Sequence, residues 1–469
     1  MKNKSLFRGT DGRYYLFPFI LVTSLFALWG FANDITNPMV AAFKNILLMD
    51  NTKSALVQTA FYGGYCFMAI PAALFIRKFN YKKGILVGLA LYAVGCLLFI
   101  PAGNAMAFWA FLIAYFVMTC GLSFLETTSN PYILALGPDE NATQRLNFAQ
   151  AFNPMGSITG MFVASQIILK KLEANDHNAL TLLQQNHADI AAGIDVSKPY
   201  AEEVRQALQQ VDPSALMNVR ETDLGIVSGP YLILGLVVLA FFLLFFFTRL
   251  PRITVAADKA YSLKQTIGIL FKNKCYLWSV VAQTFYVGVQ IMVWTFIIQY
   301  AGKELGMPKS IAQNYNIVAM AIFVTSRFIC TFLLKYFKPS TLLTVLAVGG
   351  GVFILGAMVL PNAPFVEGQY LGAYWGLFSM VAVSACMSLM FPTIYGIALK
   401  GMGDEAKLAS SGLILAIGGG SVMPWLQGVL IDNATWFESA VSSVRISYVL
   451  PLLCFIVIAS FGRWVEKRS

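Results

Sequence analysis

Long apolar blocks recur along the whole chain, and short polar turns separate them. Each block is long enough for a helix to cross a bilayer core of about 30 Å. The pattern predicts an all-α membrane protein with twelve transmembrane helices, at about residues 15–43, 54–76, 84–103, 107–136, 143–169, 225–248, 275–301, 309–335, 340–360, 367–399, 407–431 and 446–464.

Composition supports this interpretation. Of the 469 residues, 58% are hydrophobic and 12% are charged, whereas soluble proteins have about 25% charged residues. These values exclude a water-soluble enzyme, a disordered chain and a disulfide scaffold. In a soluble protein the net charge of +10 would suggest nucleic acid as a partner. In a membrane protein, Lys and Arg gather in cytoplasmic loops instead, so we expect a lipid bilayer and no nucleic acid.

The distribution of Lys and Arg predicts the orientation. Most of them lie in the termini and in the loops after the even-numbered spans, including Arg77, Lys78, Lys82 and Lys83. We therefore expect both termini in the cytoplasm and an integral plasma-membrane protein, in the inner membrane if the cell is bacterial. The first apolar run has no small-residue cleavage site and is expected to remain as the first span.

Two long connections divide the chain. An acid-rich segment at about 171–224 is predicted to be a solvated extracytoplasmic insertion. A basic cytoplasmic linker at 250–274 separates six spans from six. The predicted domains are therefore an N-terminal six-helix bundle, 1–249, and a C-terminal six-helix bundle, 275–469.

The two halves also resemble each other. In the first half, Pro131 is followed by the acidic turn Asp139–Glu140 and then by Gly156–Ser157. In the second half, Pro392, Asp404–Glu405 and Gly420–Ser421 stand at nearly the same offsets. Two six-span halves related as repeats are typical of the major facilitator superfamily, in which the substrate lies between the halves near the midplane.

Two acids, Asp34 and Glu126, fall deep within apolar spans. A charge at the bilayer centre costs roughly 2.5–3.5 kcal/mol on insertion scales, so such residues usually have a function. A carboxyl that takes up and releases a proton is one interpretation, and we assign proton coupling to both residues. A fixed carboxyl that only joins helices is the alternative.

Amides accompany these acids. On the seventh span, Gln283, Tyr286, Gln290 and Trp294 share one helix face. Amides bind sugar hydroxyls and an aromatic ring covers the apolar face of a sugar, although amides can also join neighbouring helices. The predicted substrate-binding residues are Asn33, Asn37, Asn130, Asn147, Gln150, Asn153, Gln283, Tyr286, Gln290 and Trp294.

Arg327 is the one cation deep within a span. It can pair with an acid during part of a transport cycle, or its long side chain can reach the inner membrane surface. No phosphate-binding loop, zinc-ligand spacing or Ser-His-Asp pattern is evident. We therefore expect no catalytic residues, no metal and no cofactor other than a coupling ion, and the chain is not expected to be an enzyme.

Several motifs together resemble the fucose:proton symporter family of the major facilitator superfamily. The most specific block runs from Gly121 to Asn153, and the similarity covers nearly the whole chain apart from the termini and the insertion. The motifs are Phe26-Ala-Leu-Trp29, Ala32-Asn33, Leu125-Glu126-Thr127, Asn130-Pro131, Leu136-Gly-Pro138, Arg145-Leu-Asn147, Tyr286-Val-Gly288, Phe391-Pro-Thr-Ile394 and Gly418-Gly-Gly420.

The resemblance implies cation-coupled sugar uptake, with Glu126 matching the family carboxylate that handles proton and sugar. The chain differs from the family pattern in the first span, where the family has an acid at the position of Asn37 and an asparagine at the position of Asp34. This exchange leaves open which sugar is carried. The family also includes glucose/galactose, mannose and amino-sugar carriers, some of them sodium-linked.

We therefore expect a secondary active transporter, a monomer that couples import of a neutral hexose or deoxyhexose to protons, with sodium as the other candidate ion. A drug:proton antiporter is an alternative, but it would favour a more apolar cavity with fewer amides. A non-transporting membrane sugar sensor would need a cytoplasmic output domain, and the tails and the linker are too short for one.

Overall fold

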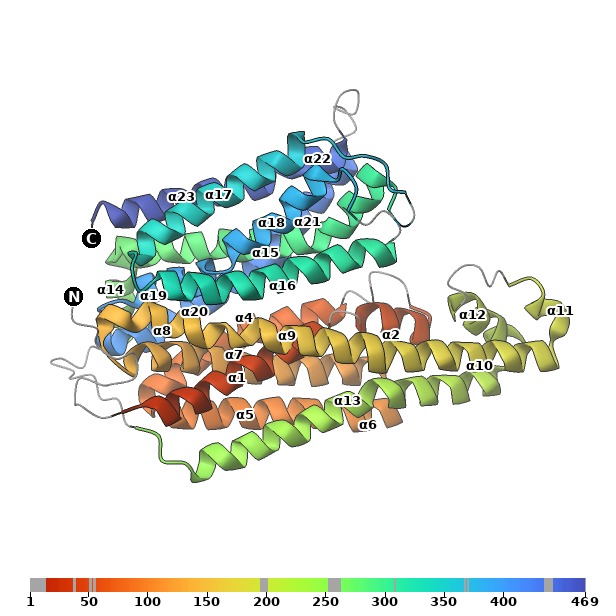
Figure 1. Cartoon of the computed structure of the whole chain (residues 1–469). Coiled ribbons are helices and arrows are strands. Elements are labelled where there is room, and N and C mark those ends of the chain that lie inside the picture. The colour runs from red at the N-terminus through yellow and green to blue at the C-terminus, as the bar shows by residue number, and fades with distance from the viewer. Residues whose placement is uncertain are drawn as a thin grey trace. The chain divides into compact units, whose positions relative to one another are not determined.

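The protein is almost entirely helical in its computed structural model (Figure 1). The structure describes residues 14–36, 39–49, 53, 56–194, 201–251, 263–307, 309–366, 368, 371–433 and 442–468. Within these ranges the β-pairing is one isolated bridge, between Asn362 and Tyr374. Eleven helical stretches in the described residues are long and apolar enough to cross a membrane, when helices that follow one another almost without a break are counted as one stretch. This confirms the predicted fold class.

Contacts group the chain into two compact units. The first compact unit contains residues 1–23, 127–152 and 252–469, and the second contains residues 24–126 and 153–251. The division into bundles at 1–249 and 275–469 remains a prediction, because these units follow packing and cut through helices.

The second compact unit packs α13 against α5 and α6, and α4 against α5. Its helices are the greater parts of α1 (Leu16–Thr36) and α7 (Phe108–Ala135), together with α2 (Met39–Leu47), α4 (Leu56–Lys78), α5 (Tyr81–Leu97), α6 (Phe99–Asn104), α9 (Phe152–Val163), the π-helical turn η2 (Ala164–Leu169), α10 (Lys170–Asn186), α11 (Ala188–Ala191), α12 (Ala201–Val211) and α13 (Pro213–Phe247).

The first compact unit has a large apolar core around α15, α17, α18 and α23. The helix α8, from the first half of the sequence, belongs to this unit and packs against α16 and α19. Its helices are α8 (Ala142–Gln150), α14 (Leu263–Lys272), α15 (Lys274–Leu305), α16 (Lys309–Leu333), α17 (Pro339–Val359), α18 (Trp375–Met387), α19 (Met390–Leu399), α20 (Ala406–Leu415), α21 (Gly419–Asn433), α22 (Ser443–Ser447) and α23 (Val449–Glu466), with the end of α7.

Several predicted spans are interrupted helices. The predicted span 143–169 is divided into α8, α9 and the π-helical turn η2, and it is the one predicted span missing from the eleven long helices. The predicted span 367–399 is likewise divided, because α18 ends at Met387 and α19 begins at Met390. A proline follows each break by three or four residues, and a proline removes one helical hydrogen bond.

The predicted insertion at 171–224 is more ordered than its composition suggests. It forms α10, α11, α12 and the first three turns of α13, which we call the cap (Figure 1). The cap has a small apolar core that includes Leu180, Leu183, Leu208 and Leu216. Its helix α12 packs against α2, the helix that follows α1.

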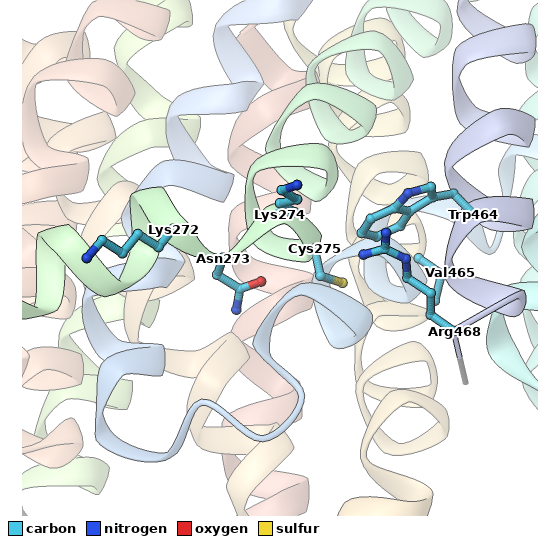
Figure 2. Close-up of a pocket in the computed structure, with 7 residues that line it drawn as sticks. All are labelled: Lys272, Asn273, Lys274, Cys275, Trp464, Val465 and Arg468. Carbon is cyan, nitrogen blue, oxygen red and sulfur yellow. The ribbon is translucent and has the colours of Figure 1, made fainter.

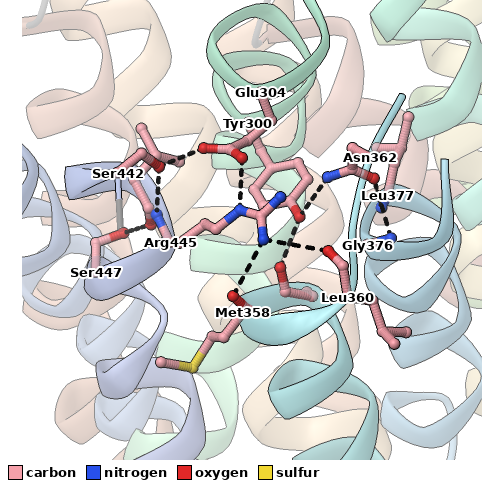
Figure 3. A network of polar contacts seen from close by, with 12 residues as sticks. Tyr300, Glu304, Met358, Leu360, Asn362, Gly376, Leu377, Ser442, Arg445 and Ser447 are labelled. Carbon is pink, nitrogen blue, oxygen red and sulfur yellow. Dashed lines mark hydrogen bonds and ion pairs between the residues drawn. The ribbon is translucent and has the colours of Figure 1, made fainter. Parts of the chain in front are cut away.

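A polar network joins four helix ends in the first compact unit (Figure 3). Arg445 of α22 forms an ion pair with Glu304 of α15, at 2.5 Å, and donates to the carbonyl oxygen of Leu360. The side-chain oxygen of Asn362 accepts from the backbone N–H of Gly376, in the first turn of α18. The network therefore holds the ends of α15, α17, α18 and α22 together.

Candidate functional site

The two predicted coupling acids both belong to the second compact unit. Asp34 is half-buried on α1, within electrostatic range of the Tyr62 phenol on α4. Asn33, its neighbour, accepts a 3.4 Å hydrogen bond from the Tyr65 hydroxyl, one turn further along α4. Asn37 lies outside the described residues. A pair of tyrosines on α4 thus faces the polar part of α1.

Glu126 is the more deeply buried acid, with 8% of its side chain exposed on α7. Its Oε2 atom is buried and has no hydrogen-bond partner among the described residues. Glu126 also lies within electrostatic range of the buried Tyr65 phenol. A buried carboxylate without a donor is costly, whereas a protonated carboxyl is tolerated. This surrounding therefore favours a carboxyl that carries a proton.

The helix α9 approaches α1 closely in the same unit. A Cβ atom on Gly30 would lie 2.0 Å from the carbonyl oxygen of Asn153, and one on Gly156 would lie 1.9 Å from that of Ala27. The side chain of Asn153 donates to the carbonyl oxygen of Phe26 at 3.4 Å. Both glycines are therefore needed for two helix backbones to touch.

Three of the predicted amides lie in the first compact unit, on α7 and α8. The Gln150 amide donates to the side-chain oxygen of Asn130 at 2.9 Å. The Asn147 amide donates to the Thr393 hydroxyl of α19 at 3.2 Å. All three amides are buried, but Asn130 Nδ2 and Asn147 Oδ1 have no partner among the described residues. Asn130 and Asn147 therefore each have one polar atom that can still bind a ligand hydroxyl.

The predicted face of the seventh span is carried by one unbroken helix, α15. Gln283 is fully buried, and neither its amide nitrogen nor its oxygen has a partner among the described residues. Tyr286 donates to the carbonyl oxygen of Met387, and Gln290 is half-buried. Trp294 donates from its indole N–H to the Ser384 hydroxyl at 3.2 Å. Gln283 is the member of this face whose hydrogen-bonding capacity is least used.

Arg327 on α16 is buried, with 3% of its side chain exposed. Its guanidinium donates to the carbonyl oxygens of Gln150 and Ser388 and lies 4.6 Å from the centre of the Phe323 ring. Among the described residues no carboxylate is within ion-pair distance of it. Its predicted role as an ion-pair partner therefore remains a prediction for another stage of a cycle.

A basic pocket of about 500 Å³ lies at the start of α15 and the end of α23 (Figure 2). Lys272, Lys274 and Arg468 line it, and the Arg468 guanidinium stacks over the Trp464 ring at 4.1 Å. None of the predicted site residues lines this pocket.

Comparison with known proteins identifies the family to which the chain belongs. The sequence model of the Major Facilitator Superfamily matches residues 21–171. The chain is 47% identical over 448 residues to the L-fucose-proton symporter of Haemophilus influenzae, covering 96% of each chain. It belongs to the fucose:proton symporter family of the major facilitator superfamily.

Two further similarities extend over the same length. The L-fucose-proton symporter of Escherichia coli is 31% identical over 463 residues, which cover 98% of this chain and 95% of that one. The crystal structure of the transporter FucP in the outward conformation has a TM-score of 0.79 and 30% identity, covering 96% and 99%. The chain therefore has the major facilitator fold, as the resemblance implied.

Some residues beside the predicted site were missed in the sequence. Tyr62 and Tyr65 lie next to the acids, and Thr393 binds Asn147. The spacing of the two tyrosines, three residues apart in a span, was the available signal, because it puts two hydroxyls on one helix face. Thr393 left no comparable signal, since its partner lies 246 residues away in sequence.

Proposed function

We propose that this member of the fucose:proton symporter family imports a neutral sugar together with a proton. L-fucose is the first candidate sugar, since the 47% identical relative is an L-fucose-proton symporter. The observation that carries the proposal is the buried Glu126 carboxyl, whose Oε2 has no partner among the described residues. A buried carboxyl that is stable when neutral can bind a proton on one side of the membrane and release it where water enters.

The sugar would bind the amides that have unused hydrogen-bonding capacity. Gln283, Asn130 and Asn147 are buried and each has at least one such atom. A sugar hydroxyl both donates and accepts, so it can satisfy an amide oxygen and an amide nitrogen in turn. Gln290 and Trp294 on the same face of α15 complete the proposed set, and Trp294 supplies the ring for the apolar side of the sugar.

Transport would follow alternating access, in which the site opens to each side of the membrane in turn. We propose that both termini lie in the cytoplasm, because Lys and Arg concentrate in the termini and the connected loops. We also propose a monomer, with no catalytic residue and no cofactor beyond the coupling ion.

The test measures sugar transport in proteoliposomes with and without a pH gradient, and with and without sodium. In Glu126→Gln, we expect gradient-driven accumulation to be lost while exchange of labelled for unlabelled sugar persists. The reason is that exchange does not require release of the proton. Asp34→Asn is the second arm, and it should also lose accumulation if both acids couple. Undiminished accumulation in Glu126→Gln, or sodium dependence of the parent, would contradict proton coupling through this residue.

A further inference from the structure

Prolines within helices leave carbonyl oxygens without their usual partner. A proline has no backbone N–H, so the carbonyl four residues earlier loses its helical hydrogen bond. Pro154 in α9 removes the donor for the carbonyl oxygen of Gln150, and Pro392 in α19 removes the donor for that of Ser388. Both prolines are buried, and water is therefore a poor substitute at these places.

One side chain satisfies both carbonyl oxygens. The Arg327 Nη1 atom lies 2.9 Å from the Gln150 carbonyl oxygen, and its Nε atom lies 2.5 Å from the Ser388 carbonyl oxygen. A guanidinium has five donors in a rigid fork and is more weakly hydrated than an ammonium. It is thus suited to bridge two carbonyl oxygens in a buried position. The stacking of Arg327 on Phe323 further covers the cation.

A third proline shows the same relationship. Pro131 lies inside α7 and removes the donor for the carbonyl oxygen of Thr127. The Ser410 hydroxyl of α20 donates to this oxygen at 3.2 Å. Ser410 comes from the second half of the sequence and Thr127 from the first. In the first compact unit, side chains of the second half therefore bind carbonyl oxygens that prolines of the first half have released.

We propose that Arg327 is a positioning residue that replaces the two main-chain donors missing at Pro154 and Pro392, and so clamps the end of α8 to the break between α18 and α19. The clamp fixes Gln150, whose amide reaches Asn130. It thereby holds two of the substrate-binding residues predicted from the sequence, of which Asn130 also belongs to the proposed sugar site.

The clamp also has a consequence for the transport cycle. Gln150 belongs to the first half of the sequence, and Arg327 and Ser388 belong to the second. If the two halves separate at this level, as alternating access requires at one stage, the bond to Gln150 breaks while the bond to Ser388 remains. This consequence for transport rests on the proposed function, whereas the hydrogen bonds of Arg327 to Gln150 and Ser388 do not.

The test restores the missing N–H groups instead of only removing the arginine. In Arg327→Leu, we expect sugar affinity and thermal stability in detergent to fall, with affinity reduced at least tenfold. In the same background, Pro392→Ala and Pro154→Ala each return a backbone N–H, so the two together should recover most of the affinity. When Arg327 is present, the same proline changes should have little effect. Arg327→Lys, which keeps a charge but lacks the fork, should fall between the parent and Arg327→Leu.

The control is Pro71→Ala in Arg327→Leu, because Pro71 lies inside α4 and Arg327 does not bind the carbonyl that it releases. It should give no recovery. If the Arg327→Leu defect is unchanged by Pro154→Ala and Pro392→Ala, or if Pro71→Ala recovers as much, the clamp is wrong. These outcomes are separate from proton coupling, because binding and stability are measured without a gradient. Failure of the Glu126→Gln test would leave them unaffected.

Discussion

The cap depends on one buried arginine. Arg205 of α12 is 2% exposed and lies between two carboxylates, at 2.5 Å from Asp176 and 2.7 Å from Asp223. Burial raises the pKa of the Asp176 carboxyl, and the Arg205 guanidinium offsets part of this rise. Removing one partner of a buried ion pair costs about 3–5 kcal/mol, since the other charge stays buried without compensation. Arg205→Met leaves both carboxylates without their guanidinium, although the Asn175 amide still donates to Asp223, so we expect the cap to lose about 3 kcal/mol.

A loss of this size should unfold the cap locally, because its apolar core is small. The assay is thermolysin cleavage within residues 171–224 of the purified protein, whose rate follows the open fraction. A change of about 3 kcal/mol corresponds to more than a hundredfold faster cleavage, at roughly 1.4 kcal/mol per factor of ten.

The matched control is Arg220→Met, because Arg220 is half-buried in the same cap and donates to the carbonyl oxygen of Ile46. It should accelerate cleavage far less. Neutralising the acids by adding Asp176→Asn and Asp223→Asn to Arg205→Met should restore part of the protection. The difference from the parent should also shrink as the pH falls, since a carboxyl with a raised pKa costs stability only when it ionises. Equal cleavage of Arg205→Met and the parent would refute the reasoning.

Two further predictions concern the spans. Gln290→Ala should weaken sugar binding about three- to tenfold, since a lost hydrogen bond to a neutral ligand costs about 0.5–1.5 kcal/mol. Trp294→Ala should weaken sugar binding by a similar factor, because the stacking surface is lost. Affinity is measured by equilibrium binding. Normal affinity in both variants would assign this face of α15 to helix packing. Gly156→Ala should lower the thermal midpoint in detergent, because its Cβ would lie 1.9 Å from the Ala27 carbonyl oxygen; Gly225→Ala, which has open space around the added atom, is the control. An equal midpoint in the two variants would contradict close contact of α1 and α9.

Much of the fold could be predicted because spans are defined by apolar length. The predicted span 107–136 is α7, Phe108–Ala135, and the predicted span 340–360 is α17, Pro339–Val359. The start of α13 was missed by about three turns, since residues 213–224 are polar and their helix is stabilised by packing in the cap. The break in the predicted span 367–399 was missed as well. Apolar composition does not change there, and the break depends on a proline and an arginine of another helix.

The candidate site divides in the same way. Asp34 and Glu126 were identifiable because a charge inside an apolar block is conspicuous in the sequence. The stripe on α15 was identifiable because its helix is continuous, so spacing alone places the residues on one face. The hydrogen bond from Tyr65 to Asn33 could not be identified from the sequence. It joins two helices whose relative placement depends on packing and not on periodicity.

The length of α13 has a mechanical consequence. Its 35 residues form a rod of about 52 Å, at 1.5 Å per residue, and a bilayer core takes up about 30 Å of it. The remainder extends into the cap. If the whole helix tilted by about 10°, the far end of a helix of this length would move by several ångströms. A spectroscopic label on the exposed Ser214, near the start of this helix, would therefore report movements of the predicted sixth span.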